Sequence, residues 1–210
     1  MKGIDISSWQ KGINFDTLKN NVDFIILRAG FTGWGNGVNK NIDECFNDFY
    51  HQCKLRSIPV GAYWYSCANT YEKGVAEAKY MYDNCLKGKQ FEFPIYIDVE
   101  ESRHQQVGKG PVTQAIKGFC ETLETLGYYV GIYANTNYFN NYIDTPILAN
   151  YDKWLANWTF NPDVKPTFKY GFFGLWQYSD KLNLAGYRLD GDVSYINYPN
   201  LIKKSKLNRF

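Results

Sequence analysis

Short apolar segments alternate with longer stretches of helical periodicity through the first two thirds of this chain, and this rhythm restricts the fold more than any other feature. The apolar segments are rich in β-branched and aromatic residues, which is typical of buried strands. The predicted strands span residues 3–7, 23–29, 59–66, 94–100 and 128–134. Strands that alternate with helices predict a parallel sheet covered by helices.

Each stretch between these strands carries one apolar face at helical spacing. The helix after the second strand is predicted over residues 42–53, with Ile42, Phe46 and Cys53 on its buried side. Two further helices are predicted around residues 78–86 and 116–123, and Gly127 is expected to end the last of them.

After about residue 150 the rhythm changes, because the strand-like segments 153–158, 171–178 and 190–196 are separated by loops too short for crossover helices. Eight strands with about five helices predict an α/β fold, a modified TIM-type barrel of the (β/α)5(β)3 kind. In such barrels the active groups gather at the C-terminal ends of the strands. An open doubly wound sheet is the alternative, but no Gly-rich phosphate loop follows the first strand.

The length of 210 residues suits one domain, with a barrel over about residues 2–200 and a basic C-terminal tail that we expect to be a solvated end. The formal charge of +2 is too small to indicate nucleic-acid binding. No apolar run approaches the roughly 20 residues that span a bilayer. Neither nucleic acid nor membrane is therefore an expected partner.

The five cysteines show no metal-site spacing, and only His51 and His104 accompany them. Cys45 and Cys53 share a helix face but lie about 12 Å apart, which is beyond the reach of a disulfide. We interpret all five as reduced core thiols and expect no metal site.

The strand over residues 94–100 carries the first candidate catalytic pair. Because side chains alternate along a strand, Tyr96, Asp98 and Glu100 face one way, toward the barrel axis, and the aliphatic residues between them face the helices. The two carboxylates would lie roughly 7 Å apart. Their mutual repulsion would keep one of them protonated, as the general acid of a glycosidase requires. Glu100 is the predicted acid and Asp98 its partner; the alternative is a pair of surface charges.

A third carboxylate, Asp5, alternates with two isoleucines on the first strand and should face inward across the barrel mouth. The alternative is a local role, because the segment from Asp5 to Ser8 also suits an Asx-turn.

Five motifs follow one another along the chain: Asp5-Ile6-Ser7-Ser8-Trp9-Gln10, Ala62-Tyr63-Trp64-Tyr65, Asp98-Val99-Glu100, Trp154-Leu155-Ala156 and Trp176-Gln177-Tyr178. Together they resemble a glycoside hydrolase family 25 lysozyme from about residue 2 to residue 200. The resemblance implies one catalytic domain over residues 1–210. It also implies hydrolysis of the β-1,4 bond between N-acetylmuramic acid and N-acetylglucosamine in bacterial peptidoglycan, without metal or cofactor.

The resemblance makes Glu100 the acid, Asp98 the group that orients the acetamido group of the substrate, and Asp5 a supporting carboxylate. Hydrolysis assisted by the N-acetyl oxygen of the substrate is a known exception to the two-carboxylate scheme, and it is the mechanism we expect. A direct aspartate nucleophile is the alternative.

The chain is rich in aromatic residues, with 18 Tyr, 14 Phe and 6 Trp, which favours a carbohydrate cleft because flat rings stack on sugars. The side chains predicted to hold the saccharide are Tyr63, Tyr65, Tyr133, Trp176 and Gln177. Core packing is the alternative for each aromatic ring. Trp64 alternates to the outer face and is expected in the core.

The chain departs from the family pattern at two places. The second strand has Arg28-Ala29-Gly30 where many members carry Lys-x-Ser/Thr-Glu-Gly. Near the end, Val193 is followed by Ser194 in place of the acid common in the family. The acids lie earlier, at Asp190 and Asp192, and we expect Asp190 to complete the site. Asp192 beside Gly191 would then be a turn residue.

Two other functions fit parts of the pattern. A chitinase-like hydrolase also uses an Asp-x-Glu at the end of its fourth strand, and a non-catalytic sugar-binding barrel would keep the aromatic cleft. Strand-like sequence begins by Gly3 with no signal peptide before it. We therefore expect synthesis in the cytosol and action on the bacterial cell wall, as for a phage endolysin, or an extracellular enzyme if the chain is truncated.

Overall fold

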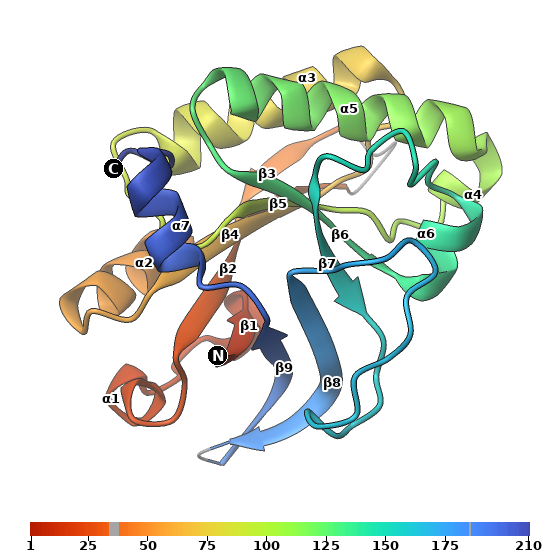
Figure 1. The fold of residues 1–210 in the computed structure, drawn as a ribbon. Helices are drawn as coiled ribbons and strands as arrows, with labels where there is room; N and C mark the ends of the chain where they lie inside the picture. Colours follow the sequence, from red (N-terminus) through yellow and green to blue (C-terminus); the bar gives the residue numbers. More distant parts are fainter. Residues whose placement is uncertain (34–37, 185) are drawn as a thin grey trace.

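A closed barrel forms the centre of the computed structural model, which describes residues 1–33, 38–184 and 186–210 (Figure 1). The strands are β1 (Lys2–Ile6), β2 (Phe24–Thr32), β3 (Lys40–Ile42), β4 (Val60–Tyr65), β5 (Ile95–Asp98), β6 (Val130–Asn135), β7 (Asp152–Ala156), β8 (Leu175–Leu184) and β9 (Tyr187–Ser194). β1 pairs with β2 on one side and with β9 on the other, so the sheet closes on itself. The predicted barrel is confirmed.

Two features of the sheet were not predicted. The short strand β3 extends the barrel by pairing antiparallel with the end of β2. β8 and β9 form a long hairpin where a loop was expected, because Leu182, Leu184 and Tyr187 pack against the core and pull the chain into extended conformation. Figure 1 shows this hairpin at the side of the barrel that lies away from α3 and α5.

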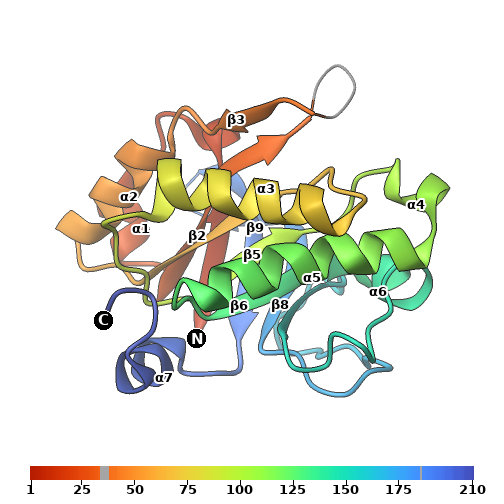
Figure 2. The same ribbon diagram turned by 90° about the horizontal axis from the view of Figure 1, so that it is seen from above.

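The helices are α1 (Phe15–Lys19), α2 (Phe46–Leu55), α3 (Tyr71–Met81), α4 (His104–Val107), α5 (Lys109–Thr125), α6 (Thr136–Asn141) and α7 (Tyr198–Ser205), with a single 3-10 turn over Ser8–Gln10 and a π-helical extension of α3 over Tyr82–Leu86. α3 and α5 lie side by side over the sheet (Figure 2). Gly74 and Gly118 allow this contact, since a Cβ on either would lie 2.0 or 2.2 Å from a carbonyl oxygen of the other helix.

The second helix begins later than predicted. Ile42 belongs to β3, and α2 starts at Phe46, because the turn formed by residues 43–45 separates the two elements. Phe46, Phe49 and Cys53 form its buried face, as expected. Gly127 follows α5 with φ of +84°, a conformation that favours glycine, so this predicted helix end is confirmed.

Two hydrophobic layers fill the molecule. The outer layer lies between the sheet and the helices and contains Ile97, Val99 and Trp64. The inner layer fills the barrel and is largely aromatic, with Tyr96 and Tyr133 both packed against Trp154. The alternation predicted for the strand over residues 94–100 therefore holds, and Trp64 lies in the core as expected.

The C-terminal segment is not the solvated tail that its charges suggested. Tyr198 and Ile202 of α7 are fully buried in the inner layer of the barrel. Asn208 is also fully buried; its Nδ2 donates to the carbonyls of Phe91 and Phe93, and its Oδ1 accepts from the amide of Tyr129. The lysines lie on the exposed outer face of this segment, and the buried residues between them close the barrel at the N-terminal ends of its strands.

All five cysteines are free thiols, and four of them are buried as predicted. Cys67 differs, because it lies half-buried just past the end of β4, where its Sγ contacts Oε2 of Glu101 at 3.6 Å. No helix within the described residues is both long and apolar enough to cross a membrane.

Candidate active site

The end of β5 carries the predicted carboxylate pair. Asp98 is the last residue of the strand and is buried, whereas Glu100 lies two residues further and is exposed to solvent on one side. The strand register places Asp98 between Tyr65 of β4 and Tyr133 of β6. Both carboxylates therefore lie at the C-terminal mouth of the barrel, where the fold collects polar groups.

Asp5 faces the same mouth from β1. The turn after β1 is capped by Ser7, whose hydroxyl accepts from the amide of Trp9, while the amide of Ser7 donates to Oε1 of Gln10. Asp5 is therefore not the cap of this turn. Its Oδ2 instead accepts a hydrogen bond of 2.8 Å from Nε2 of Gln177.

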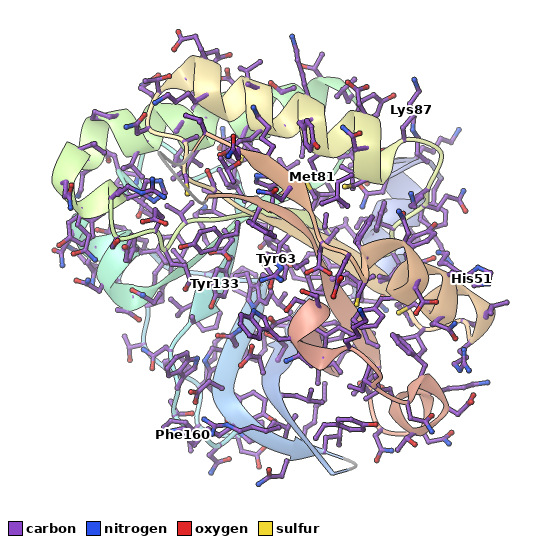
Figure 3. All side chains as sticks on the ribbon, turned by 180° about the vertical axis from the view of Figure 1, so that it is seen from behind. His51, Tyr63, Met81, Lys87, Tyr133 and Phe160 are labelled. Carbon is purple, nitrogen blue, oxygen red and sulfur yellow. The ribbon has the colours of Figure 1, made fainter. Side chains whose placement is uncertain are left out.

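Gln177 connects Asp5 to the opposite wall. Its Oε1 accepts from the hydroxyl of Tyr133 at 3.0 Å and from the indole Nε1 of Trp158, also at 3.0 Å. Figure 3 shows Tyr133 and Tyr63 pointing into the interior of the barrel. The orientation of the Gln177 amide is fixed by this network, since its only donor group faces Asp5.

The two acids of β9 have different surroundings. Asp190 lies directly opposite Asp5 in the strand register and lines the same pocket. Asp192 is fully buried below it, and its Oδ1 accepts from Nε1 of Trp154 at 2.8 Å. Asp192 is part of a strand, so its alternative interpretation as a turn residue is wrong.

A pocket of about 440 Å³ joins these groups. Its lining includes the four predicted catalytic residues and two of the predicted saccharide contacts, which are Asp5, Asp98, Glu100, Asp190, Tyr63 and Tyr65. Asp5 comes from β1, the two tyrosines from β4, Asp98 from β5 and Asp190 from β9. Glu100 lies two residues after the end of β5. The structure thus brings together residues that are up to 185 positions apart in the sequence.

The carboxyl groups of this pocket hold protons more tightly than free carboxyl groups do. Burial, and then repulsion by Glu100, raise the pKa of Asp98 well above its usual range, although Arg28 opposes this shift. Removal of water by the cleft walls, and then Asp190, raise the pKa of Glu100. Burial raises the pKa of Asp190 to about 6. A proton donor near neutral pH is what this environment provides.

Asp98 also retains an unused acceptor. Its Oδ1 is buried without a hydrogen-bond partner among the described residues. A buried carboxylate oxygen without a partner is costly, so this atom is suited to a donor that arrives with a ligand.

Comparison with known proteins identifies the family. The family model described as glycosyl hydrolases family 25 matches residues 4–187. The chain belongs to this family. Its members are glycoside hydrolases, which agrees with a mouth of the barrel that carries several carboxylates with raised pKa values.

The autolytic lysozyme of Clostridium acetobutylicum is 26% identical to this family 25 chain over 196 residues, which cover 92% of this chain and 55% of that relative. The chain thus spans little more than half the length of this curated relative. Among solved structures, the CTP1L endolysin is 22% identical with a TM-score of 0.81, over 97% of this chain and 69% of that one. The spore cortex lytic enzyme SleM of Clostridium perfringens is 24% identical with a TM-score of 0.80, over 93% and 67%. These two likenesses show the fold.

One predicted saccharide contact of the family 25 chain is wrong. Trp176 is 0% exposed and lies in the outer hydrophobic layer, against Tyr178. Its Nε1 donates to the carbonyl of Asn157. The alternation of β8 explains the error, because the neighbouring Gln177 takes the inward position and Trp176 must then face the outside of the barrel.

Three residues at the mouth were missed as functional candidates. Trp9 is 84% exposed and lines the pocket. Trp158 binds Gln177 through its indole nitrogen and is half exposed. Arg28, from the strand that departs from the family pattern, lines the pocket and forms an ion pair of 2.7 Å with Asp43. Apart from the place of Trp9 in the first motif, nothing in the sequence predicts that its side chain is exposed.

Within residues 1–33, 38–184 and 186–210, no group of three or more His, Cys, Asp or Glu side chains is arranged to hold a metal ion.

Proposed function

We propose that this chain is a lysozyme that hydrolyses the β-1,4 bond between N-acetylmuramic acid and N-acetylglucosamine in bacterial peptidoglycan. The observation that carries the proposal is the pairing of Glu100, open to solvent and with a raised pKa, with the buried Asp98, which has an unused acceptor oxygen. The family supports glycosidase chemistry. The autolytic lysozyme relative supports the choice of bond.

In the proposed mechanism Glu100 donates its proton to the glycosidic oxygen while that bond breaks. Asp98 accepts a hydrogen bond from the N–H of the acetamido group of the sugar. This bond turns the acetamido oxygen toward the anomeric carbon. That oxygen forms the new bond and gives a bicyclic oxazolinium ion. Glu100, now a carboxylate, removes a proton from the water that opens this ion, and the acid is restored.

The proposed division of roles follows from the two environments. The acid must exchange protons with water in each cycle, and Glu100 is the member of the pair with solvent access. The orienting group must exclude water from its hydrogen bond with the substrate, and Asp98 is the buried member. Asp190, which lies opposite Asp5 in the register of β1 and β9, has a pKa of about 6 because of burial and would supply negative potential for the cationic transition state at neutral pH.

The bond is tested by digesting purified cell walls with wild-type protein and with the variants Glu100→Gln and Asp98→Asn. Glu72→Gln, an exposed residue on α3, is the matched control. New sugar ends are reduced with borohydride and identified. We expect new muramic acid ends from the wild-type and control proteins, and a loss of at least 100-fold with Glu100→Gln.

Three results would refute parts of this proposal. Hydrolysis of chitin but not of cell walls would make the chain a chitinase-like enzyme. Binding of walls without any new ends would make it a non-catalytic sugar-binding barrel. A covalent sugar trapped on an aspartate would replace the substrate-assisted mechanism with direct attack.

The bacterial cell wall is the proposed place of action. The relatives carry the names autolytic lysozyme, endolysin and spore cortex lytic enzyme, all of which describe lysis of bacterial walls or spore coverings. Lysis of intact cells by externally added protein, measured as loss of turbidity, would support this assignment.

A further inference from the structure

A second pocket continues the cleft beyond the carboxylates. It has a volume of about 760 Å³ and shares Trp9, Arg28 and Tyr65 with the pocket that contains Asp98 and Glu100. The two pockets are therefore adjacent, close enough for different parts of one polymer unit to occupy both.

The charged groups that line the two pockets differ. Four carboxylates and one arginine line the pocket with Asp98 and Glu100. The second pocket contains two arginines, Arg28 and Arg103, and its acids are already paired: Glu44 with Lys11 and Glu101 with Arg103. Partial burial opposes ionisation of Glu101, but hydrogen bonds from Arg103 lower its pKa to about 2. The charges that line the second pocket thus balance, two arginines against two glutamates, whereas the lining of the first pocket is net negative. Of the two pockets, the second is the one better suited to a negative group.

Both guanidinium groups are held in place by the protein. Nε and Nη2 of Arg28 bind Asp43, and Nη2 also donates to the hydroxyl of Ser8. Nε of Arg103 donates to Glu101, and its Nη2 contacts Sγ of Cys67. Within the part of the chain that the structure describes, Nη1 of each arginine has no protein acceptor. A fixed guanidinium with spare N–H groups loses little freedom when it binds a carboxylate.

Three aromatic side chains also line this pocket. Trp9 is 84% exposed, Tyr65 donates to Oε2 of Glu101, and the ring of Phe31 lies 5.3 Å from the guanidinium carbon of Arg28. Flat rings beside arginines suit a ligand that has both apolar and anionic parts. A neutral chain of N-acetylglucosamine has no anionic part. The muramic acid residues of peptidoglycan do have one, because their lactyl group carries a short peptide with free carboxylates.

We propose that the second pocket binds a carboxylate of the peptide attached to muramic acid, with Arg103 as the main contact and Arg28 as a second. Arg103 has the more accessible side chain, with 41% exposure against 17% for Arg28. The inference rests on the function proposed above and names the part of the substrate that the enzyme selects.

The test compares two forms of one substrate: soluble glycan strands with their peptides, and the same strands after an N-acetylmuramoyl-L-alanine amidase has removed the peptides. Amide hydrolysis leaves a lactyl carboxylate on each muramic acid of these bare strands, so the two forms differ in how far a carboxylate reaches from the sugar and not in whether one is present. For Arg103→Gln we expect kcat/KM to fall about tenfold on the peptide-bearing strands, mainly through KM, and to change less than twofold on the bare strands. Arg103→Lys keeps the positive charge but lacks the planar guanidinium that binds a carboxylate through two N–H groups. Its loss of kcat/KM on the peptide-bearing strands should therefore be smaller than that of Arg103→Gln. Arg56→Gln is the control, because Arg56 pairs with Asp16 outside both pockets.

Two outcomes would overturn the inference. One is an equal loss with Arg103→Gln on both substrates, which would mean that Arg103 only positions Glu101 and Tyr65. The other is a wild-type protein that cleaves bare and peptide-bearing strands equally well.

Failure of the proposed function would look different, since the wild-type protein would then cleave neither form. Binding still tests the pocket in that case. The Glu100→Gln protein should bind a peptide-bearing disaccharide more tightly than the same disaccharide without its peptide, and rising salt should reduce this preference. Equal binding of both disaccharides would contradict the inference.

Discussion

Gln177 donates a hydrogen bond of 2.8 Å to Asp5 across 172 positions of sequence, and it does so from a strand that does not pair with the strand of Asp5. β9 lies between β8 and β1, so this bond spans the inside of the barrel mouth. It also lowers the pKa of Asp5, against burial and the charges of Asp190 and Asp192, which raise it. The net effect raises the pKa of Asp5 well above its usual range, so this amide positions the cleft carboxylate and favours its charged form without determining its charge.

Gln177→Glu should therefore damage both folding and catalysis. The substitution removes the donor to Asp5 and places a second carboxyl group against it, while the acceptor for Tyr133 and Trp158 is kept. We expect the free energy of unfolding at pH 7 to fall by about 2 kcal/mol and wall lysis to fall at least tenfold. Urea denaturation and turbidity assays measure the two effects. Gln106→Glu, an exposed change on α4, should alter neither.

Asp190→Asn should shift the pH dependence of hydrolysis. After removal of water by the cleft walls, the charge of Asp190 is the cause that raises the pKa of Glu100. Without that charge Glu100 loses its proton at lower pH, so the alkaline limb of the kcat/KM profile should move toward acid. An unchanged limb in Asp190→Asn would show that the acid is another group, and Asp163→Asn, in an exposed loop, provides the control.

Glu77 should make stability depend on pH in the neutral range. It is 2% exposed, binds Ser66 and the amide of Cys67, and burial raises its pKa to about 7 from 4.5. Because the folded state holds the proton of Glu77 more tightly than the unfolded state does, this protonation stabilises the fold. Its contribution to the free energy of unfolding is complete below about pH 4.5 and is lost as pH rises through 7. Between pH 5 and pH 8 the wild-type protein should lose about 3 kcal/mol relative to Glu77→Gln.

Denaturation of both proteins at several pH values tests the role of Glu77. A constant difference between them across this range would mean that Glu77 is ionised in the folded protein throughout.

Asn208→Ala should destabilise the barrel although it lies two residues before the end of the chain. The substitution leaves the carbonyls of Phe91 and Phe93 and the amide of Tyr129 without their partner in a buried place. We expect a loss of about 2–4 kcal/mol in the free energy of unfolding. Asn200→Ala, on the exposed side of α7, should cost less than about 0.5 kcal/mol. Equal effects of the two changes would contradict the role given to Asn208.

The barrel was predictable because its strands are locally encoded. Apolar segments such as 94–100 carry a two-residue alternation that fixes which side chains face inward, and the observed sides of Asp98 and Ile97 follow it. The hairpin of β8 and β9 was missed because its polar residues read as a loop. Only packing of Leu182 and Leu184 against the core, which sequence does not reveal, makes it extended.

The candidate site was predictable residue by residue but not as a network. Motifs along the chain pointed to Asp5, Asp98 and Glu100, and the structure places all three in one pocket. Side chains alternate along β8, so either Gln177 or Trp176 faces the inside of the barrel. Both residues are large, and the sequence therefore does not show which of them faces inward. The pairing of Arg28 with Asp43 depends on β3, a strand of three residues with no periodic signal.

The closure of the barrel by α7 also determines how the protein can be attached to a surface. The chain ends beside the N-terminal ends of β5 and β6, where Asn208 holds it, whereas the cleft opens at the other end of the barrel. A support coupled to Phe210 would therefore lie behind the catalyst and leave the cleft facing outward. For a substrate as large and insoluble as a cell wall, that orientation would decide whether an immobilised enzyme works at all.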